Sequence, residues 1–145
     1  MKITPRLTVI TLGVSDMARA IGFYDRLGLE RRMKATGEEV AFYKAGAMTL
    51  ALYPSGNLAD EAGVARATSS GFREMTLAWN CSSPDEVEAG MAHAVKAGGK
   101  LIKPAQKTEY GGVAGYFADP DGHVWEIVTA PGIEVQADGR VSVPE

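Results

Sequence analysis

The sequence predicts an α+β fold made of two βαβββ modules, and three observations support this prediction. Two segments of the 145-residue chain repeat one plan, in which an alternating strand is followed by a capped helix and then by further strands. Glycine and proline residues mark the turns between these elements. Hydrophobic residues make up 46% of the chain and charged residues 23%, the balance of a globular domain that can bury a core. We place module one at 7–53, a connection at 54–71, module two at 72–131 and a C-terminal arm at 132–145.

Each module begins with a predicted strand, at 7–14 and at 74–81, whose side chains alternate between two faces. On the first strand, Val9 and Thr11 lie opposite an apolar face made of Ile10, Leu12 and Val14. On the second strand, Thr76, Ala78 and Asn80 lie opposite Leu77, Trp79 and Cys81. We expect the two apolar faces to pack against helices.

A capped helix is predicted after each of these strands. Ser15 and Asp16 can cap the first helix, and Gly28 stands where a left-handed C-terminal residue is favoured. The second helix begins at 83–86, Ser-Pro-Asp-Glu, which combines a capping box with proline at the first helical position. The glycine pair at 98–99 ends it.

Three further strands are predicted in each module. They lie at 31–33, 40–43 and 48–53 in module one, and at 100–102, 114–118 and 124–128 in module two. The turn Asp119-Pro120-Asp121-Gly122 joins the last two strands, and His123 after it is expected to serve the turn or an interface. A short helix is possible at 58–64, and a small hairpin is possible around Asp138-Gly139 in an otherwise loose arm.

Net charge and cysteine content limit which partners and which cellular compartment we expect. The net charge of −3 gives no basic surface that could neutralise phosphates, so nucleic acid and anionic membranes are not expected partners. Cys81 is the single cysteine, which excludes an internal disulfide and favours the cytoplasm. Neither a signal peptide nor a membrane span is predicted. Because the chain has neither a P-loop nor a dinucleotide fingerprint, we expect no cofactor.

Several motifs resemble one family. The phrase Val-Ser-Asp-Met at 14–17 is followed by Gly-Phe-Tyr at 22–24 and Leu-Gly-Leu at 27–29. Together with the stretch 112–126, these motifs resemble the vicinal oxygen chelate superfamily, which includes glyoxalases, extradiol dioxygenases and bleomycin-sequestering proteins. The resemblance covers residues 7–131. It implies that each module curls into half a barrel, with helices outside and a cavity within.

The resemblance also implies where a metal would bind. Metal-using members carry four ligands on strands facing the cavity, and the corresponding positions here are Val9, Leu50, Thr76 and Glu126. Only Glu126 is a plausible ligand, whereas a divalent catalytic site needs about three His, Asp or Glu donors. We therefore predict a metal-free site. A one-residue slip of the first strand changes nothing, because 7–14 contains neither histidine nor acid.

Strand parity predicts the wall of the cavity. The apolar half consists of Val9, Thr11, Met48, Leu50 and Leu52, and the polar half consists of Glu74, Thr76, Ala78, Asn80 and Glu126. Such a mixture is typical of small-molecule pockets. Glu74 faces the cavity only if its strand begins early, and is otherwise a solvated rim residue. Tyr110, in a glycine-rich loop, either lies over the cavity mouth or packs on the surface.

Three functions remain open on this evidence. The first is metal-free binding of a small, partly apolar organic ligand, as in the bleomycin-sequestering members. The second is an isomerase- or epimerase-like enzyme that uses Glu126 for proton transfer beside a carbonyl. The third, ranked last, is a metal-dependent glyoxalase or dioxygenase. Glu126 could instead have no functional role and only hydrogen-bond a backbone group or a buried water.

The exposed edges of a half barrel favour a homodimer.

Overall fold

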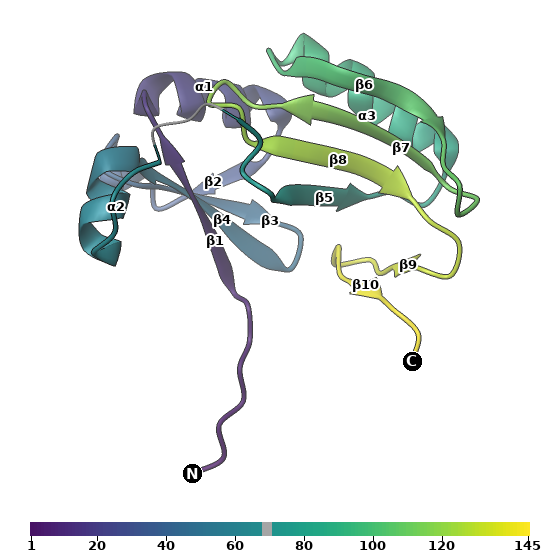
Figure 1. Cartoon of the computed structure of the whole chain (residues 1–145), viewed down its shortest axis with the longest axis horizontal. Helices are drawn as coiled ribbons and strands as arrows, with labels where there is room; N and C mark the ends of the chain where they lie inside the picture. The colour runs from purple at the N-terminus through teal and green to yellow at the C-terminus, as the bar shows by residue number, and fades with distance from the viewer. Residues whose placement is uncertain (68–70) are drawn as a thin grey trace.

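The computed structural model describes residues 1–67 and 71–145 and confirms the two βαβββ modules (Figure 1). Module one contains β1 (Val9–Val14), α1 (Met17–Leu27), β2 (Glu30–Arg32), β3 (Ala41–Ala45) and β4 (Met48–Pro54). A 3₁₀ turn (Lys34–Thr36) follows β2, and α2 (Ser55–Ala62) follows β4. Module two contains β5 (Thr76–Asn80), α3 (Pro84–Lys96), β6 (Lys100–Lys107), β7 (Val113–Ala118) and β8 (Val124–Thr129). The arm carries β9 (Glu134–Val135) and β10 (Val141–Ser142).

The two sheets have equivalent topologies. Their strand orders are β1-β4-β3-β2 and β5-β8-β7-β6. In each, the first strand pairs in parallel with the last, and the remaining neighbours are antiparallel. The core-facing side of each sheet is packed in the hydrophobic core, and we call the opposite side the open face. In module one α2 lies against one end of the open face, because a Cβ atom on Gly13 would lie 3.1 Å from Oγ of Ser55 (Figure 1).

The predicted helix caps are present. The Asp16 side chain accepts a hydrogen bond from the backbone N–H of Arg19, and Gly28 ends α1 with φ of 100°. The Ser83 side chain accepts from the N–H of Glu86, and the Glu86 carboxylate accepts from the N–H of Ser82. The bonds to Arg19 and Glu86 satisfy amide groups that the first turn of a helix leaves free, and the bond from Ser82 holds the residue before the cap. None of the helices in the described ranges is long and apolar enough to cross a membrane.

One hydrophobic core joins the two modules. Phe23 and Tyr24 of α1 contact aromatic rings of module two, with ring centroids 6.4 Å apart for Phe23 and Phe117 and 6.1 Å apart for Tyr24 and Trp125. Leu12, Leu52 and Ile127 are also fully buried in this cluster. Because α1 of module one contacts residues of module two in this single core, the two modules are packed as one unit.

The turn at 119–122 fastens module two to the start of module one. The Tyr24 hydroxyl donates to Asp119 over 2.8 Å, and the Trp125 indole N–H donates to Tyr24 over 3.1 Å. Burial and the Asp119 charge raise the pKa of Tyr24 far above its ordinary value, so the hydroxyl remains a donor. Asp121 accepts from the Ser15 N–H and hydroxyl over 2.8 and 2.7 Å. The His123 ring nitrogen lies 2.8 Å from the carbonyl oxygen of Gly13, which confirms its interface role.

The C-terminal arm forms the hairpin that the Asp138-Gly139 pair suggested. Val135 pairs with Val141 in an antiparallel register, and Gly139 takes a φ of 90° in the turn. The hairpin lies beside the outer edge of β5 (Figure 1).

Candidate functional site

The ladder of module one corrects part of the predicted cavity wall. Val9 pairs with Thr49 and Thr11 with Ala51, so these four residues share the open face. Leu50 and Leu52 pair instead with the core residues Ile10 and Leu12, and their exposed fractions are 3% and 0%. The prediction that Leu50 and Leu52 line the cavity was therefore wrong, because the parity of β4 is one residue out of step with the assignment.

Met48 was assigned to the same cavity wall, and the structure supports that assignment only in part. It starts β4 on the same face as Leu50, but it is only half-buried at the β3–β4 turn and lines two surface cavities. The family resemblance placed a metal-ligand position at Leu50. In the observed register the residues of β4 that face the open side are its neighbours Thr49 and Ala51. Neither of these side chains offers a carboxylate or an imidazole.

Module two brings the predicted polar half together. Thr76, Ala78 and Asn80 of β5 pair with Val124, Glu126 and Val128 of β8, so all six lie on one open face. Thr76 and Ala78 are exposed, whereas Asn80 and Glu126 are half-buried. Glu126 therefore lies on an open sheet face that carries both apolar side chains, Ala78, Val124 and Val128, and polar ones, Thr76 and Asn80.

Sequence reasoning missed Tyr116 as a partner of Glu126. The two residues are opposite each other in the β7–β8 ladder, and the Tyr116 hydroxyl donates a hydrogen bond to Oε2 of Glu126. This bond, together with burial and the carboxylate charge, raises the pKa of Tyr116 to about 12. Counting strand residues outward from the predicted turn at 119–122 would have paired Tyr116 with Trp125 instead, because His123 also belongs to the connection and Ala118 pairs with Val124.

The remaining predicted site residues lie at the margin. Glu74 precedes β5, is exposed and has a φ of 57°. Of the two alternatives for this residue, it is therefore the solvated rim residue and not a cavity-facing one. Tyr110, in the β6–β7 loop, is 56% exposed.

The donor set does not fit a catalytic divalent metal. The open-face positions that correspond to metal ligands carry Val9, Thr49 or Ala51, Thr76 and Glu126, and Glu126 already accepts a bond from Tyr116. No group of three His, Cys, Asp or Glu side chains able to hold an ion occurs within 1–67 and 71–145. One carboxylate and hydroxyl groups are too few donors for zinc, iron or manganese.

Two cavities lie beside the sheets, one on the open face of module one and one at the edge of β5. One of about 530 Å³ lies on module one and is lined by residues that include Val9, Thr49, Lys44 and Arg32. The other, of about 800 Å³, lies between β5, the β3–β4 turn and the C-terminal hairpin. Ala78 lines the second cavity and is the ladder partner of Glu126, so that cavity is one strand away from the carboxylate.

Paired βαβββ modules with open sheet faces define a glyoxalase-like fold. The model of the Glyoxalase/Bleomycin resistance protein/Dioxygenase superfamily matches residues 6–127, and the chain belongs to this superfamily. A glyoxalase-related enzyme from Fulvimarina pelagi is 36% identical, with a TM-score of 0.86 over 98% of this chain and 100% of that one.

More distant structures share the fold. A glyoxalase/bleomycin resistance protein/dioxygenase family enzyme from Burkholderia phytofirmans is 16% identical, with a TM-score of 0.74 over 85% of this chain and 97% of that one. A lactoylglutathione lyase from Agrobacterium tumefaciens is 21% identical, with a TM-score of 0.65 over 88% and 95%. No curated protein sequence matches the chain.

Proposed function

We propose that this protein binds a small, partly apolar organic molecule on the open face around Glu126, without a metal ion. The observation that carries the proposal is the Tyr116–Glu126 hydrogen bond. It fixes the carboxylate and engages one of its oxygens, so the other can accept a bond from a ligand. Ala78, Val124 and Val128 give an apolar surface beside the carboxylate, so the matching ligand has an apolar body and an amine, amide or hydroxyl donor.

A charge series on one aromatic body tests this specificity. Naphthylmethylamine, naphthamide and naphthoate share the same two rings and differ only in the polar group. We expect the amine to bind most tightly, because its cation makes a charge-assisted hydrogen bond with Glu126. Isothermal titration should show that Glu126→Gln weakens binding of the amine roughly 10- to 100-fold, while binding of naphthoate is not weakened.

Two further variants complete the design. Tyr116→Phe frees the carboxylate to rotate and should weaken amine binding by less than Glu126→Gln does. Glu74→Gln is the matched control, since Glu74 is an exposed acid outside the sheet, and it should leave the affinity unchanged. Equal affinity of the native protein and Glu126→Gln for the amine would contradict the proposal.

We further infer that the protein is a homodimer in which a second copy covers the open faces. Val9 on the open face is 43% exposed, and both β1 and β5 are at sheet edges. Exposed apolar side chains beside unpaired strand edges favour association. Light scattering that gives the mass of one chain at micromolar concentration would refute this inference.

A second candidate, proton transfer beside a carbonyl, is favoured by the chemistry of the same pair. The Tyr116 hydroxyl holds Oε2 of Glu126, and the other carboxylate oxygen can accept a proton from the carbon beside a carbonyl. Acetoin in heavy water is a direct probe. An enzyme of this type racemises acetoin and introduces deuterium at the carbinol carbon, and Glu126→Gln abolishes both effects. Recovery of unchanged acetoin removes this candidate for small hydroxyketones.

We also infer a cytoplasmic location, the compartment in which an unpaired thiol such as Cys81 stays reduced. Cell fractionation that finds the protein in an oxidising compartment would contradict it.

A further inference from the structure

The cavity of about 530 Å³ on module one has a cationic part and an apolar part. Its volume lies within the roughly 300–1,000 Å³ of small-molecule sites. Lys44 and Arg32 supply the positive charge, and Phe42, Val9 and Met48 supply the apolar surface. Within the described ranges, none of the residues that line this cavity is an acid. In a chain whose net charge is −3, such a cavity is a local basic site and suits an anionic ligand.

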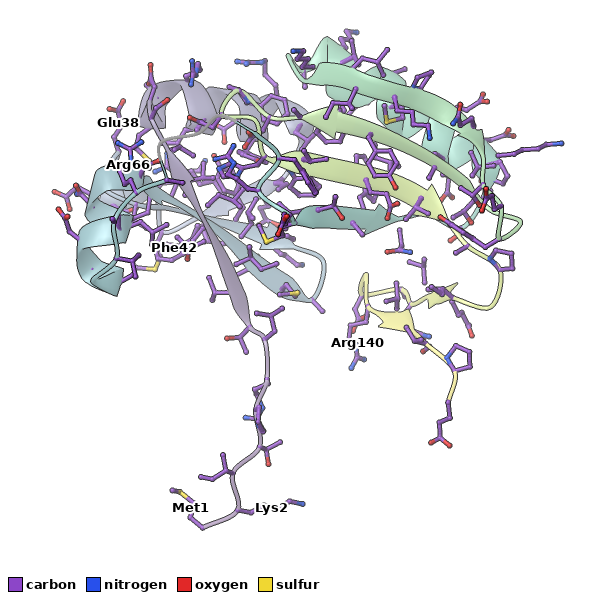
Figure 2. The ribbon with its side chains drawn as sticks, in the orientation of Figure 1. Met1, Lys2, Glu38, Phe42, Arg66 and Arg140 are labelled. Atoms are coloured by element: carbon purple, nitrogen blue, oxygen red, sulfur yellow. The ribbon has the colours of Figure 1, made fainter. Side chains whose placement is uncertain are left out.

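The strand register brings these groups together on the open face. Lys44 pairs with Thr49 across β3 and β4, so its side chain lies on the same face as Thr49. Phe42 is two residues before Lys44 on β3 and shares that face, and its partner on β2 is Arg32. Figure 2 shows Phe42 on module one, well away from Arg140 of the C-terminal hairpin. The cationic and apolar groups are therefore neighbours on one sheet.

Lys44 is free to bind an anion, whereas Arg32 is partly engaged. Lys44 forms no ion pair with any residue in 1–67 or 71–145. Nη2 of Arg32 lies 3.0 Å from Oε1 of Glu30, and both side chains are exposed. A guanidinium has five N–H donors, so this contact leaves donors for a second acceptor. With Glu30 beside the two cations, one positive charge remains unbalanced, which matches a monoanion better than a dianion.

The backbone at Met33 holds a thioether at the rim of the cavity. Met33 has a φ of 47° and a ψ of 51°, in the left-handed region that residues with a side chain rarely adopt. Its side chain lines the cavity and is 67% exposed. Strained residues of this kind are concentrated at functional sites, ligand clamps among them. The Met33 sulfur and the Phe42 ring together offer a polarizable surface for an aromatic ligand.

We propose that this cavity binds an aromatic monocarboxylate. The carboxylate accepts hydrogen bonds from the Lys44 ammonium and the Arg32 guanidinium, and the aromatic body packs against Phe42 and Met33. The site goes beyond the one proposed at Glu126, because its lining residues all belong to module one and it selects the opposite charge. The homodimer proposed above covers this face and would enclose the bound carboxylate, which strengthens its contacts with both cations.

A second naphthalene series tests the charge that the cavity selects. Naphthoate should bind more tightly than naphthylmethanol, which has no charge, and naphthyl phosphate should bind no more tightly than naphthoate. Tighter binding of the phosphate would overturn the assignment of a monocarboxylate. In isothermal titration we expect Lys44→Gln and Arg32→Gln each to weaken naphthoate binding roughly 3- to 10-fold.

Three more variants separate a site from a general effect of charge. Lys44→Arg keeps the charge and should retain most of the affinity for naphthoate. Glu30→Gln removes the carboxylate that competes for Arg32, so it should tighten naphthoate binding roughly 2- to 5-fold. The matched control is Lys103→Gln, an exposed lysine on β6 of module two, which should leave the affinity unchanged. Because all the changed residues are exposed, the thermal unfolding of each variant should match that of the native protein.

Methionine methyl signals in NMR show where the aromatic ring lies. Naphthoate should shift the signals of Met33 and Met48, which line the cavity, through the ring current of the naphthalene. Met75, which is 48% exposed and precedes β5 in module two, is the internal control and should not move. Naphthoate that leaves Met33 and Met48 unshifted would overturn the proposal, as would an unchanged affinity of the double variant Lys44→Gln with Arg32→Gln.

These results separate the two proposed sites. Naphthylmethylamine that fails to bind, together with naphthoate that shifts Met33, would remove the ligand proposed for Glu126 and keep the anion site. Naphthoate binding that is lost in Glu126→Gln and kept in Lys44→Gln would place the anion in module two and overturn the inference.

Discussion

We predict that the hydrogen bonds of the Asp119 carboxylate are the main polar contact between the two modules, and that Asp119→Ala is strongly destabilising. Asp119 is 4% exposed. It accepts the Tyr24 hydroxyl over 2.8 Å and the backbone N–H groups of Asp121 and His123 over 2.9 and 2.8 Å. Removing it leaves a buried hydroxyl and two turn amides without their acceptor. At about 1–3 kcal/mol for the buried hydroxyl and about 0.5–1.5 kcal/mol for each amide, the expected loss is roughly 2–6 kcal/mol.

Thermal and denaturant unfolding provide the assay. For a chain of this size the loss corresponds to a fall in Tm of roughly 7–20 °C. Tyr24→Phe should cost about 1–3 kcal/mol, and the double variant should cost less than the sum, because both changes break one hydrogen bond. Asp138→Ala is the control, since its ion pair with Arg140 is solvent-exposed and should contribute little. A loss of less than 1 kcal/mol for Asp119→Ala would refute the reasoning.

Three further predictions concern other parts of the molecule. The pKa of Tyr116 is raised from an ordinary 10.0 to about 12 in the folded protein, so its contribution to stability is complete below pH 10 and is lost as the pH rises toward 12. Spectrophotometric titration should show a phenol that ionises late, and Glu126→Gln should move this ionisation to lower pH. Leu52→Ala should cost about 2–5 kcal/mol in denaturant unfolding whereas Thr11→Ala should cost under about 0.5 kcal/mol, and similar values would contradict the β4 register. Gly139→Ala, at a φ of 90° and in contact with Gly46, should detach the hairpin and increase its amide hydrogen exchange, and unchanged protection would contradict the packing.

The elements that the sequence predicted well are those with local signals. Alternation on β1 and β5 and the caps at Asp16 and Ser83 depend on neighbours within one turn or one strand. The face of β4 was assigned wrongly because Met48 to Tyr53 is uncharged throughout, so its own pattern does not distinguish the faces. Only the pairing with β1 decides which face is buried, and pairing is a property of the tertiary fold.

The candidate site was predictable in part for the same reason. Glu126 could be found because it is the single acid on an apolar strand. Tyr116 could not be linked to it by composition, since the link is a cross-strand register. The hydrogen bonds of Tyr24 with Asp119 and with Trp125 join residues about a hundred positions apart, and no local pattern indicates them.

The dependence of ligand binding on metal is the most direct test of the account. Protein dialysed against a chelator is titrated with naphthylmethylamine, before and after equimolar zinc, manganese or ferrous iron is restored. The arrangement of Tyr116 and Glu126 predicts one affinity in all four samples. Binding that disappears with the chelator and returns with any one of these ions would contradict the central claim.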